Sequence, residues 1–218
     1  MQQWIRYALR LVFSVVLAGP ISLAVAQNGG DPTAVALSAV QVCPLKVGAV
    51  VPLVTLRNVQ GIEVDLKTEI AKKPTVLVFY RGSWCVYCNR QMSQLKEIES
   101  GILELGYQVI AVSPDRAEKL NETLDKYGLK YTLLSDSKMI AAQAFGLAFR
   151  VSQETLDRYK RINIDLDDAS GENHHLLPVP AVFIVGQDGI IRVEYVNPNY
   201  KVRIDPDVIL AAAKSALK

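Results

Sequence analysis

Beyond residue 74, segments with the apolar pattern of a buried strand take turns along the chain with segments that have the apolar spacing of a helix. Thr75–Tyr80 is an unbroken run of β-branched and aromatic residues, which is typical of a strand covered on both faces, as in a parallel sheet packed between helices. After Gly82, apolar residues recur every three or four positions and predict a helix that begins near Cys85 and ends near Gly101 or Gly106. These regularly spaced residues are Met92, Leu95, Ile98 and Ile102.

Strand and helix patterns keep alternating towards the C-terminus. We expect further strands and helices over 109–112, 113–127, 133–134, 138–145, 181–185 and 207–217. Residues 186–189 read Gly-Gln-Asp-Gly, a turn sequence that predicts a hairpin with a second strand over 190–196. In the last helix, Val208, Leu210 and Ala211 are expected to face the core. This order of elements predicts an α/β fold with a mixed β-sheet.

Residues 152–177 interrupt this regular alternation. The segment is charged and polar, with only a weak helical pattern at its beginning, and we interpret it as a surface insertion that could overhang a functional site. His174 and His175 lie near its end. Exposed histidines are the simpler interpretation, and the alternative is that one of them approaches the functional site and titrates near neutral pH.

The first 26 residues have the layout of an export signal. A short head with Arg6 and Arg10 precedes an apolar run that Gly19 and Pro20 interrupt and that ends in Ala-Val-Ala, a sequence that a signal peptidase accepts. A membrane-spanning helix needs about 20 uninterrupted apolar residues, which makes an uncleaved anchor the weaker alternative. We therefore expect 1–26 to be removed, with the protein periplasmic or secreted and no stable membrane insertion after cleavage.

The mature chain is expected to have two parts. Residues 27–47 are rich in Gly, Pro and small side chains and carry no sustained amphipathic period, so they are predicted to form an N-terminal arm. Residues 48–218 are predicted to form one folded domain that contains the insertion.

The charge balance excludes one class of partner. The chain has 218 residues, half of them apolar and 21% charged, which fits one globular domain with a substantial core. The formal net charge of +2 comes from the first 26 residues, which hold two arginines and no acid, so the remainder carries 22 basic and 22 acidic side chains. Nucleic-acid phosphates require clustered Lys and Arg, and we therefore expect no nucleic-acid partner.

Cys85 and Cys88 are the residues most informative about function. Two residues separate them, so their thiols can close a small disulfide ring. They fall where a buried strand is predicted to meet a helix, and the free N–H groups and positive dipole of a helix start lower the pKa of a thiol below its ordinary value of about 8.5. A thiolate attacks disulfides or peroxides, and a neighbouring cysteine can then trap the product. Export would place this pair in an oxidising compartment.

Other interpretations of the pair are weaker. A zinc site needs four ligands, and the chain offers three cysteines and two histidines without a second close pair, so no metal and no other cofactor is expected. A purely structural disulfide that closes so short a loop would add little stability. Trp84 directly precedes the pair, which favours a functional role for it over an ordinary core position. Cys43 in the arm is a second resolving thiol, a regulatory thiol or a bystander, and we favour the last two.

At this point the sequence resembles a family. FYRGSWCVYC over 79–88, together with VPAVFIVGQDGIIR within 178–192, resembles the thioredoxin-like superfamily and, more closely, its alkyl hydroperoxide reductase/thiol-specific antioxidant branch of peroxiredoxin-like proteins. The resemblance extends over about Pro44–Leu217. It implies a thioredoxin-like fold, in which helices flank a central mixed sheet and the redox motif lies at a helix N-terminus.

Two lineages within this resemblance assign the site differently. Compared with thioredoxins, Cys85 is the nucleophile and Cys88 the resolving thiol, and Val179-Pro180 matches a cis-proline turn whose backbone docks a substrate strand. Compared with peroxiredoxins, the proline, threonine and peroxidatic cysteine of the family fall on Arg81, Cys85 and Cys88, so two of the three differ. The peroxidase arginine expected beside Pro180 is absent from the sequence there. Arg81 could supply a guanidinium instead, although a surface charge is the simpler interpretation of an isolated arginine.

Three functions therefore remain open. The first is an exported peroxiredoxin-type antioxidant enzyme that reduces hydroperoxides through Cys88 or Cys85, forms the Cys85–Cys88 disulfide, and is recycled by a thioredoxin-like dithiol electron donor. The second is a thioredoxin-like reductase or exchanger that uses the same pair on protein disulfides. The third is a non-enzymatic binding module in which the disulfide only braces the start of the helix. The pair favours thiol redox chemistry much more strongly than it selects a substrate.

Overall fold

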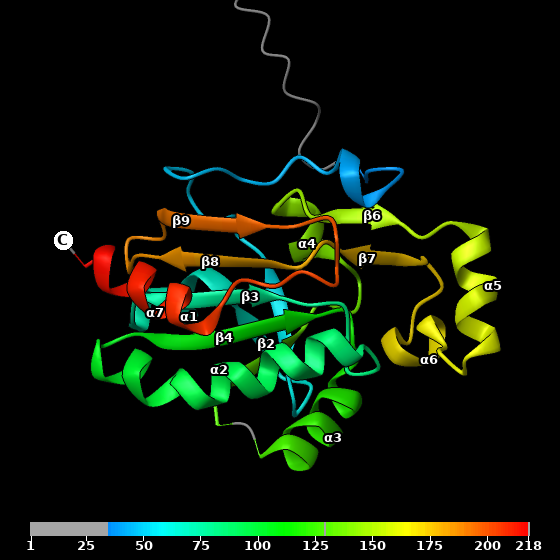
Figure 1. Cartoon of the computed structure of the whole chain (residues 1–218), viewed down its shortest axis with the longest axis horizontal. Coiled ribbons are helices and arrows are strands. Elements are labelled where there is room, and N and C mark those ends of the chain that lie inside the picture. Colours follow the sequence, from blue (N-terminus) through cyan, green and yellow to red (C-terminus); the bar gives the residue numbers. More distant parts are fainter. Residues whose placement is uncertain (1–34, 129, 218) are drawn as a thin grey trace, which may run out of the picture.

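A seven-stranded mixed sheet forms the centre of the molecule (Figure 1). The computed structural model describes residues 35–128 and 130–217, so the predicted export signal and the first part of the arm lie outside the described residues. The strands follow one another across the sheet in the order β2-β1-β5-β4-β3-β8-β9. Their bounds are β1 Thr55–Asn58, β2 Glu63–Asp65, β3 Thr75–Phe79, β4 Gln108–Ser113, β5 Thr132–Ser135, β8 Ala181–Val185 and β9 Ile191–Val196.

The central strands confirm the pattern of buried runs. All five residues of β3 are buried, β3 pairs with β4 in parallel, and β4 pairs in the same way with β5. On its other side β3 pairs antiparallel with β8, which continues through a tight turn into β9. A strand in this position has helices over both faces, which is why its sequence is continuously apolar.

Helices cover both faces of the sheet. Apolar residues of α2, α3 and α7 pack with Val76 and Val78 on one face, whereas residues of α1 and α4 pack with Leu77 and Phe79 on the other. Successive side chains of a strand point to opposite faces, which explains this division. The helices are α1 Leu66–Lys72, α2 Val86–Glu104, α3 Ala117–Tyr127, α4 Ile140–Ala144, α5 Gln153–Arg161, α6 Leu166–Ser170 and α7 Pro206–Ser215, with a short 3₁₀ helix, η1, at Ala39–Gln41. Within the described residues, none of the helices has the length and apolar character needed to cross a bilayer.

The α/β class and the mixed sheet are confirmed, and some details of the prediction are wrong. The sequence pattern did not indicate β1, β2 and α1, because strands of four and three residues are too short to show a period. In α7 the buried residues are Ile209 and Ala213, whereas Val208 and Ala211 are exposed. Leu210 is partly buried and packs against the core as expected, and the centre of the inward face lies at Ile209 and Ala213, which are one helical turn apart.

A second, two-stranded sheet flanks residues 152–177, the predicted insertion. β6 (Ala148–Arg150) pairs antiparallel with β7 (Leu176–Pro178), and the segment between them contains α5 and α6 (Figure 1). The described part of the predicted arm lies along β6, where the Ala36 N–H donates to the Ala148 carbonyl at 3.1 Å. The arm thereby adds an isolated parallel bridge to Phe149 at the edge of this sheet.

Candidate active site

The turn between β3 and α2 places both cysteines at a helix start. The Cys85 N–H donates to the Gly82 carbonyl at 3.1 Å, and Cys85 is the N-cap of α2. Gly82 has φ +138°, and a Cβ there would lie 2.5 Å from Trp84 Nε1 and 2.8 Å from Asp115 Oδ1. Only glycine fits this turn, because side-chain-bearing residues rarely adopt that backbone and the space is already filled. Cys88 follows in the first turn of the helix, as the sequence predicted.

Cys85 is the more acidic of the two thiols. Its side chain is 4% exposed, and its pKa is lowered to about 6, first because the Cys88 thiol donates a hydrogen bond to it and then because of the charge of Arg81, the Cys88 backbone N–H and the charge of Arg203. Burial alone would act in the opposite direction. A sulfur with this pKa is mostly thiolate at neutral pH, and the thiolate is the reactive form of cysteine.

Cys88 has the opposite character. Its side chain is fully buried, and burial, followed by the hydrogen bond to Cys85 and the charge on that sulfur, raises its pKa well above the ordinary value. Arg203 Nη2 lies 3.4 Å from Cys88 Sγ and partly opposes these effects. Both cysteines are free thiols in this structure. The pair therefore consists of one thiolate-forming sulfur and one sulfur that holds its proton.

Arg81 is enclosed by aromatic rings rather than exposed to solvent. It is 3% exposed, so the expectation of a surface charge is wrong. Its Nη1 lies 4.0 Å from Cys85 Sγ, and its Nη2 donates to the Tyr159 hydroxyl. The guanidinium carbon lies 4.0 Å from the centre of the Tyr200 ring and 5.0 Å from that of Trp84. Cation–π contacts of this kind let a guanidinium keep its charge in a buried position.

The insertion covers this site from the side. Tyr159 of α5 packs against Trp84 in a tilted arrangement, with 5.4 Å between ring centres, and it belongs to a small apolar cluster that includes Leu156 and Leu177. The overhang anticipated from residues 152–177 therefore consists mainly of α5 with Tyr159. Sequence reasoning missed both Tyr159 and Tyr200, because nothing in their local patterns indicates a contact with a residue so distant in sequence.

The acidic second half of the insertion has a structural explanation. The Asp165 carboxylate caps α6 by accepting hydrogen bonds from the N–H groups of Asp167 and Asp168. Asp168 pairs with Arg116 at 2.8 Å and with Lys119 at 3.3 Å. These acids hold the insertion against the start of α3, and they form a helix cap and ion pairs rather than a metal cluster.

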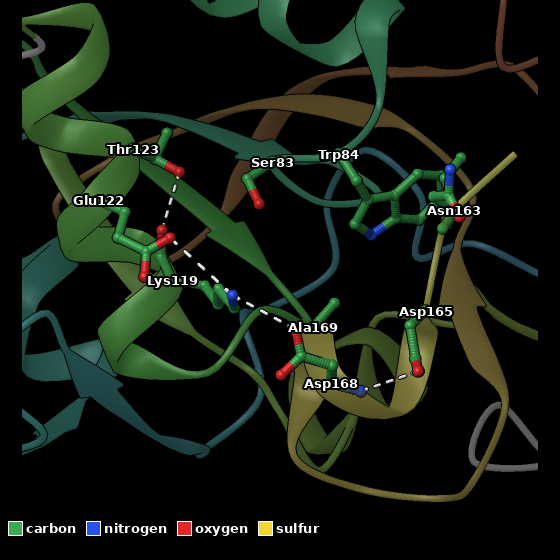
Figure 2. A pocket seen from close by; sticks show the side chains of 10 residues that line it. Ser83, Trp84, Lys119, Glu122, Thr123, Asn163, Asp165, Asp168 and Ala169 are labelled. Carbon is green, nitrogen blue, oxygen red and sulfur yellow. Dashed lines mark hydrogen bonds and ion pairs between the residues drawn. The ribbon is translucent and has the colours of Figure 1, made fainter.

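Trp84 also forms one wall of a cleft of about 260 Å³ between α3 and the insertion. Figure 2 shows Lys119 reaching between Glu122 and Asp168 on one side of this cleft, with Trp84 and Asn163 on the other. The cleft is bounded by side chains of both charges.

Asp115 is a buried acid that the sequence analysis interpreted only as part of a helix start. Its side chain is fully buried, and Oδ2 accepts the Ser83 N–H at 2.7 Å, which fixes the turn before Cys85. Burial raises its pKa to about 6, against the opposing effect of the Ser83 hydrogen bond. The position of this acid at the end of β4, the parallel neighbour of β3, is the signal that could have identified it.

Val179 and Pro180 lie beside the site, but not in the predicted arrangement. The antiparallel register pairs Phe79 with Ala181, so these two residues reach the same edge of the sheet as Arg81. No peptide bond among the described residues is cis, so the expected cis-proline turn is wrong. The Val179 N–H donates to the Leu147 carbonyl at 2.9 Å. That backbone donor is thus already paired within the fold and is not free to bind a substrate strand.

The remaining candidate residues, His174, His175 and Cys43, contact backbone groups or side chains elsewhere in the fold. His174 Nδ1 accepts the Leu176 N–H at 2.9 Å, and its Nε2 lies 2.7 Å from the Ser137 carbonyl. His175 pairs with Asp167 at 3.0 Å. Cys43 is exposed, and its carbonyl packs against Gly146. In the part of the chain that the structure describes, no group of three or more His, Cys, Asp or Glu side chains could hold a metal ion.

Comparisons with known proteins identify relatives of this chain. The model of the AhpC/TSA family matches residues 47–194. The peroxiredoxin Bcp of Escherichia coli is 30% identical over 135 residues, which are 61% of this chain and 85% of that protein. The bcp protein of Haemophilus influenzae is 35% identical over 104 residues, 48% of this chain and 66% of that protein. The thiol-disulfide oxidoreductase ResA of Halalkalibacterium halodurans is 27% identical over 93 residues, 42% of this chain and 52% of that protein.

Solved structures agree on the fold. The crystal structure of peroxidoxin BcpB from Mycobacterium tuberculosis superposes with a TM-score of 0.62 at 18% identity, and the match covers 78% of this chain and 97% of that one. Taken together, the mixed sheet and a cysteine pair at the start of α2 define a thiol-based oxidoreductase with a thioredoxin-like fold. The chain belongs to the AhpC/TSA family and is an enzyme of peroxiredoxin type, which confirms the family resemblance.

Proposed function

We propose that this protein is a thiol-dependent peroxidase in which Cys85 attacks the hydroperoxide and Cys88 resolves the product. The observation that carries the proposal is the acidity of Cys85, which lies at the N-cap of α2 with Arg81 Nη1 4.0 Å from its sulfur. The buried Cys88 keeps its proton and donates it to Cys85 in a hydrogen bond. A poised thiolate with a neighbouring thiol is the arrangement that the two steps require.

The proposed reaction has three steps, namely oxidation of Cys85, formation of the Cys85–Cys88 disulfide and its reduction by an external donor. The Cys85 thiolate attacks the terminal oxygen of a hydroperoxide, the O–O bond breaks, and the alkoxide takes a proton to leave as an alcohol, with Cys85 left as a sulfenic acid. Cys88 Sγ then attacks Cys85 Sγ, the S–S bond forms, and the S–O bond breaks with release of water. An external thioredoxin-like dithiol donor reduces this disulfide by exchange and becomes oxidised itself.

The assignment of Cys85 as the attacking sulfur departs from the peroxiredoxin lineage of the resemblance. That lineage would make Cys88 the peroxidatic residue, but Cys88 is fully buried and has a raised pKa. Arg81 stands where that lineage has proline, and its guanidinium lies beside Cys85. The local electrostatics therefore favour the outer cysteine.

We further propose that the enzyme works outside the cytoplasm, in the periplasm or as a secreted protein. The support is the sequence pattern of residues 1–26. Fractionation of cells that express the full chain, followed by N-terminal sequencing of the product, tests this directly. A mature protein that begins at Gln27 outside the cytoplasm is expected, and an intact N-terminus in the cytosolic fraction would contradict it.

Peroxide consumption by the reduced protein tests the main proposal. The parent is expected to consume hydrogen peroxide or an organic hydroperoxide and to lose two thiols per molecule. Cys85→Ser should abolish consumption, Cys88→Ser should allow one turnover that stops at a sulfenic acid, and Cys43→Ser should behave as the parent. Consumption that survives Cys85→Ser and is lost with Cys88→Ser would reverse the assignment.

Disulfide exchange on proteins is the second candidate function. It is favoured by the low pKa of Cys85 and by the similarity to a thiol-disulfide oxidoreductase. Reduced protein that leaves peroxide untouched over minutes but reduces the disulfides of insulin would select this function over the first.

A further inference from the structure

Each sulfur of the pair has an arginine of its own. Arg81, from the end of β3, lies beside Cys85, whereas Arg203, from the connection between β9 and α7, lies beside Cys88 with its Nη2 3.4 Å from that Sγ. The two guanidinium groups reach the pair from segments more than a hundred residues apart. The proposed reaction gives the first arginine a role, and it leaves the second without one.

The connection that carries Arg203 holds it in place by its backbone. Arg203 Nη1 donates to the Tyr200 carbonyl and, at 3.2 Å, to the Val202 carbonyl. The Tyr200 ring lies 5.7 Å, edge to face, from that of Tyr87, so the connection is also fixed against the first turn of α2. Carbonyl oxygens orient the guanidinium without neutralising it.

The positive charge of Arg203 remains available to the sulfur. Among the described residues, no carboxylate lies within ion-pair distance of Arg203. Asp205, two residues away, accepts the Asp207 N–H at 2.9 Å as the cap of α7. An unneutralised guanidinium beside a buried sulfur stabilises the thiolate of that sulfur.

The other charged and titratable groups around Cys88 make the stabilisation of its thiolate by Arg203 decisive for its reactivity. Cys85 lies before it on α2, Tyr80 faces it from the end of β3, and the Arg81 backbone N–H faces its sulfur. Once Cys85 has become a neutral sulfenic acid, no anion remains on that side. Burial is then the main obstacle to deprotonation of Cys88, and Arg203 is the cation in contact with it.

We propose that Arg203 is a catalytic residue of the disulfide-forming step, in which its guanidinium stabilises the Cys88 thiolate while this sulfur attacks the oxidised sulfur of Cys85. The inference rests on the roles proposed above for the two cysteines. In the step, the Cys88–Cys85 S–S bond forms as the S–O bond of the sulfenic acid breaks, and the departing hydroxide takes a proton to give water. Arg81 acts mainly in the first step and Arg203 mainly in the second, because each guanidinium lies in contact with a different sulfur.

Reaction with the aromatic disulfide DTNB separates the two steps without any peroxide. The Cys85 thiolate releases one coloured thiolate as it forms a mixed disulfide, and the attack of Cys88 on Cys85 Sγ then releases a second. In stopped-flow measurements in a Cys43→Ser background, which removes the exposed third thiol, Arg203→Met should slow the second release about 10- to 100-fold, since hydrogen bonds to charged groups contribute about 1.5–3 kcal/mol. The first release should slow less, because the charge of Arg203 is the last of the causes that lower the pKa of Cys85. The pH midpoint of the second release should also rise.

Matched variants keep this result interpretable. Arg203→Lys should recover part of the second rate, because it restores a charge without the planar fork. Arg90→Met removes an exposed arginine that lines the same cleft as Arg203, and it should match the parent in both steps. If Arg203→Met alters both releases equally, or neither, the proposed role of Arg203 is wrong. If the second release depends on Arg203 but the protein leaves peroxide untouched, the peroxidase function fails while this inference stands.

Discussion

Replacement of Arg81 by methionine should raise the pKa of Cys85. The substitution keeps much of the length of the side chain and removes the cation whose Nη1 lies 4.0 Å from the sulfur. Two unit charges at that distance attract by about 1 kcal/mol in bulk water and by about 4 kcal/mol at an effective dielectric constant of 20. Since 1.36 kcal/mol corresponds to about one pKa unit, the pKa of Cys85 should rise from about 6 by about 1 to 3 units.

Ultraviolet absorbance of the thiolate during a pH titration measures this shift. The Cys88→Ser background leaves Cys85 as the buried sulfur that titrates and keeps a hydroxyl that can donate to it, so the largest cause of its acidity is retained. Arg81→Lys should give an intermediate pKa. Arg57→Met, which removes an exposed arginine paired with Glu63, should leave the titration unchanged. If the curves of the Arg81→Met variant and its parent coincide, the electrostatic account of Cys85 is refuted.

Three further predictions concern stability, each checked by urea unfolding. Tyr159→Ala should lower the free energy of unfolding by about 3–5 kcal/mol and Tyr159→Phe by about 1–2 kcal/mol, because the ring packs against Trp84 while the hydroxyl accepts from Arg81. Equal losses would show that the ring contributes nothing. Asp115 has a pKa of about 6, above its unfolded value of about 3.9, so its ionisation destabilises the fold as the pH rises through this interval. Asp115→Asn should therefore raise stability at pH 7 by about 1–2 kcal/mol and flatten the pH dependence between about pH 4 and 6, and an unchanged profile would contradict this assignment. Ile102→Ala, at a fully buried position of α2, should lower the free energy of unfolding by about 2–5 kcal/mol, whereas Leu103→Ala, at a neighbouring position that is 51% exposed, should lower it little. Similar losses would mean that the buried face of α2 is misassigned.

The central elements were predictable because their sequence patterns are long and buried. The run that begins at Thr75 is continuously apolar, and Met92, Leu95 and Ile102 keep a helical period, so β3 and α2 could be located without the structure. The junction between them follows directly, and with it the position of the cysteine pair. Local pattern is sufficient when a segment is covered on both faces or on one regular face.

The surroundings of the pair could not be predicted in this way. Arg81 looks like any surface arginine until Tyr159 and Tyr200 are brought against it from two other parts of the chain. Asp115 follows a buried strand, and only the parallel pairing of β3 with β4 places it beneath the turn at Ser83. These contacts depend on tertiary packing, and packing also decides whether a charged residue is exposed or enclosed.

The backbone at Val179-Pro180 shows the limit of reasoning from resemblance. The motif matched a turn known from thioredoxins, but in this chain the Val179 N–H donates to the Leu147 carbonyl, next to the small β6–β7 sheet. A match of two residues could not predict that the Leu147 carbonyl accepts the Val179 N–H. Val179-Pro180 lies at the position that the resemblance indicates, but the Val179 N–H is already paired within the fold.

Competitive alkylation with peptide mapping tests the central assignment most directly. Reduced protein is treated briefly with limiting iodoacetamide across a range of pH, and the modified cysteine is identified by mass spectrometry. Modification of Cys85, with a pH midpoint near its pKa of about 6 and with Cys88 left unmodified, is the predicted result. Preferential modification of Cys88, or a midpoint for Cys85 near the ordinary thiol value of about 8.5, would contradict it.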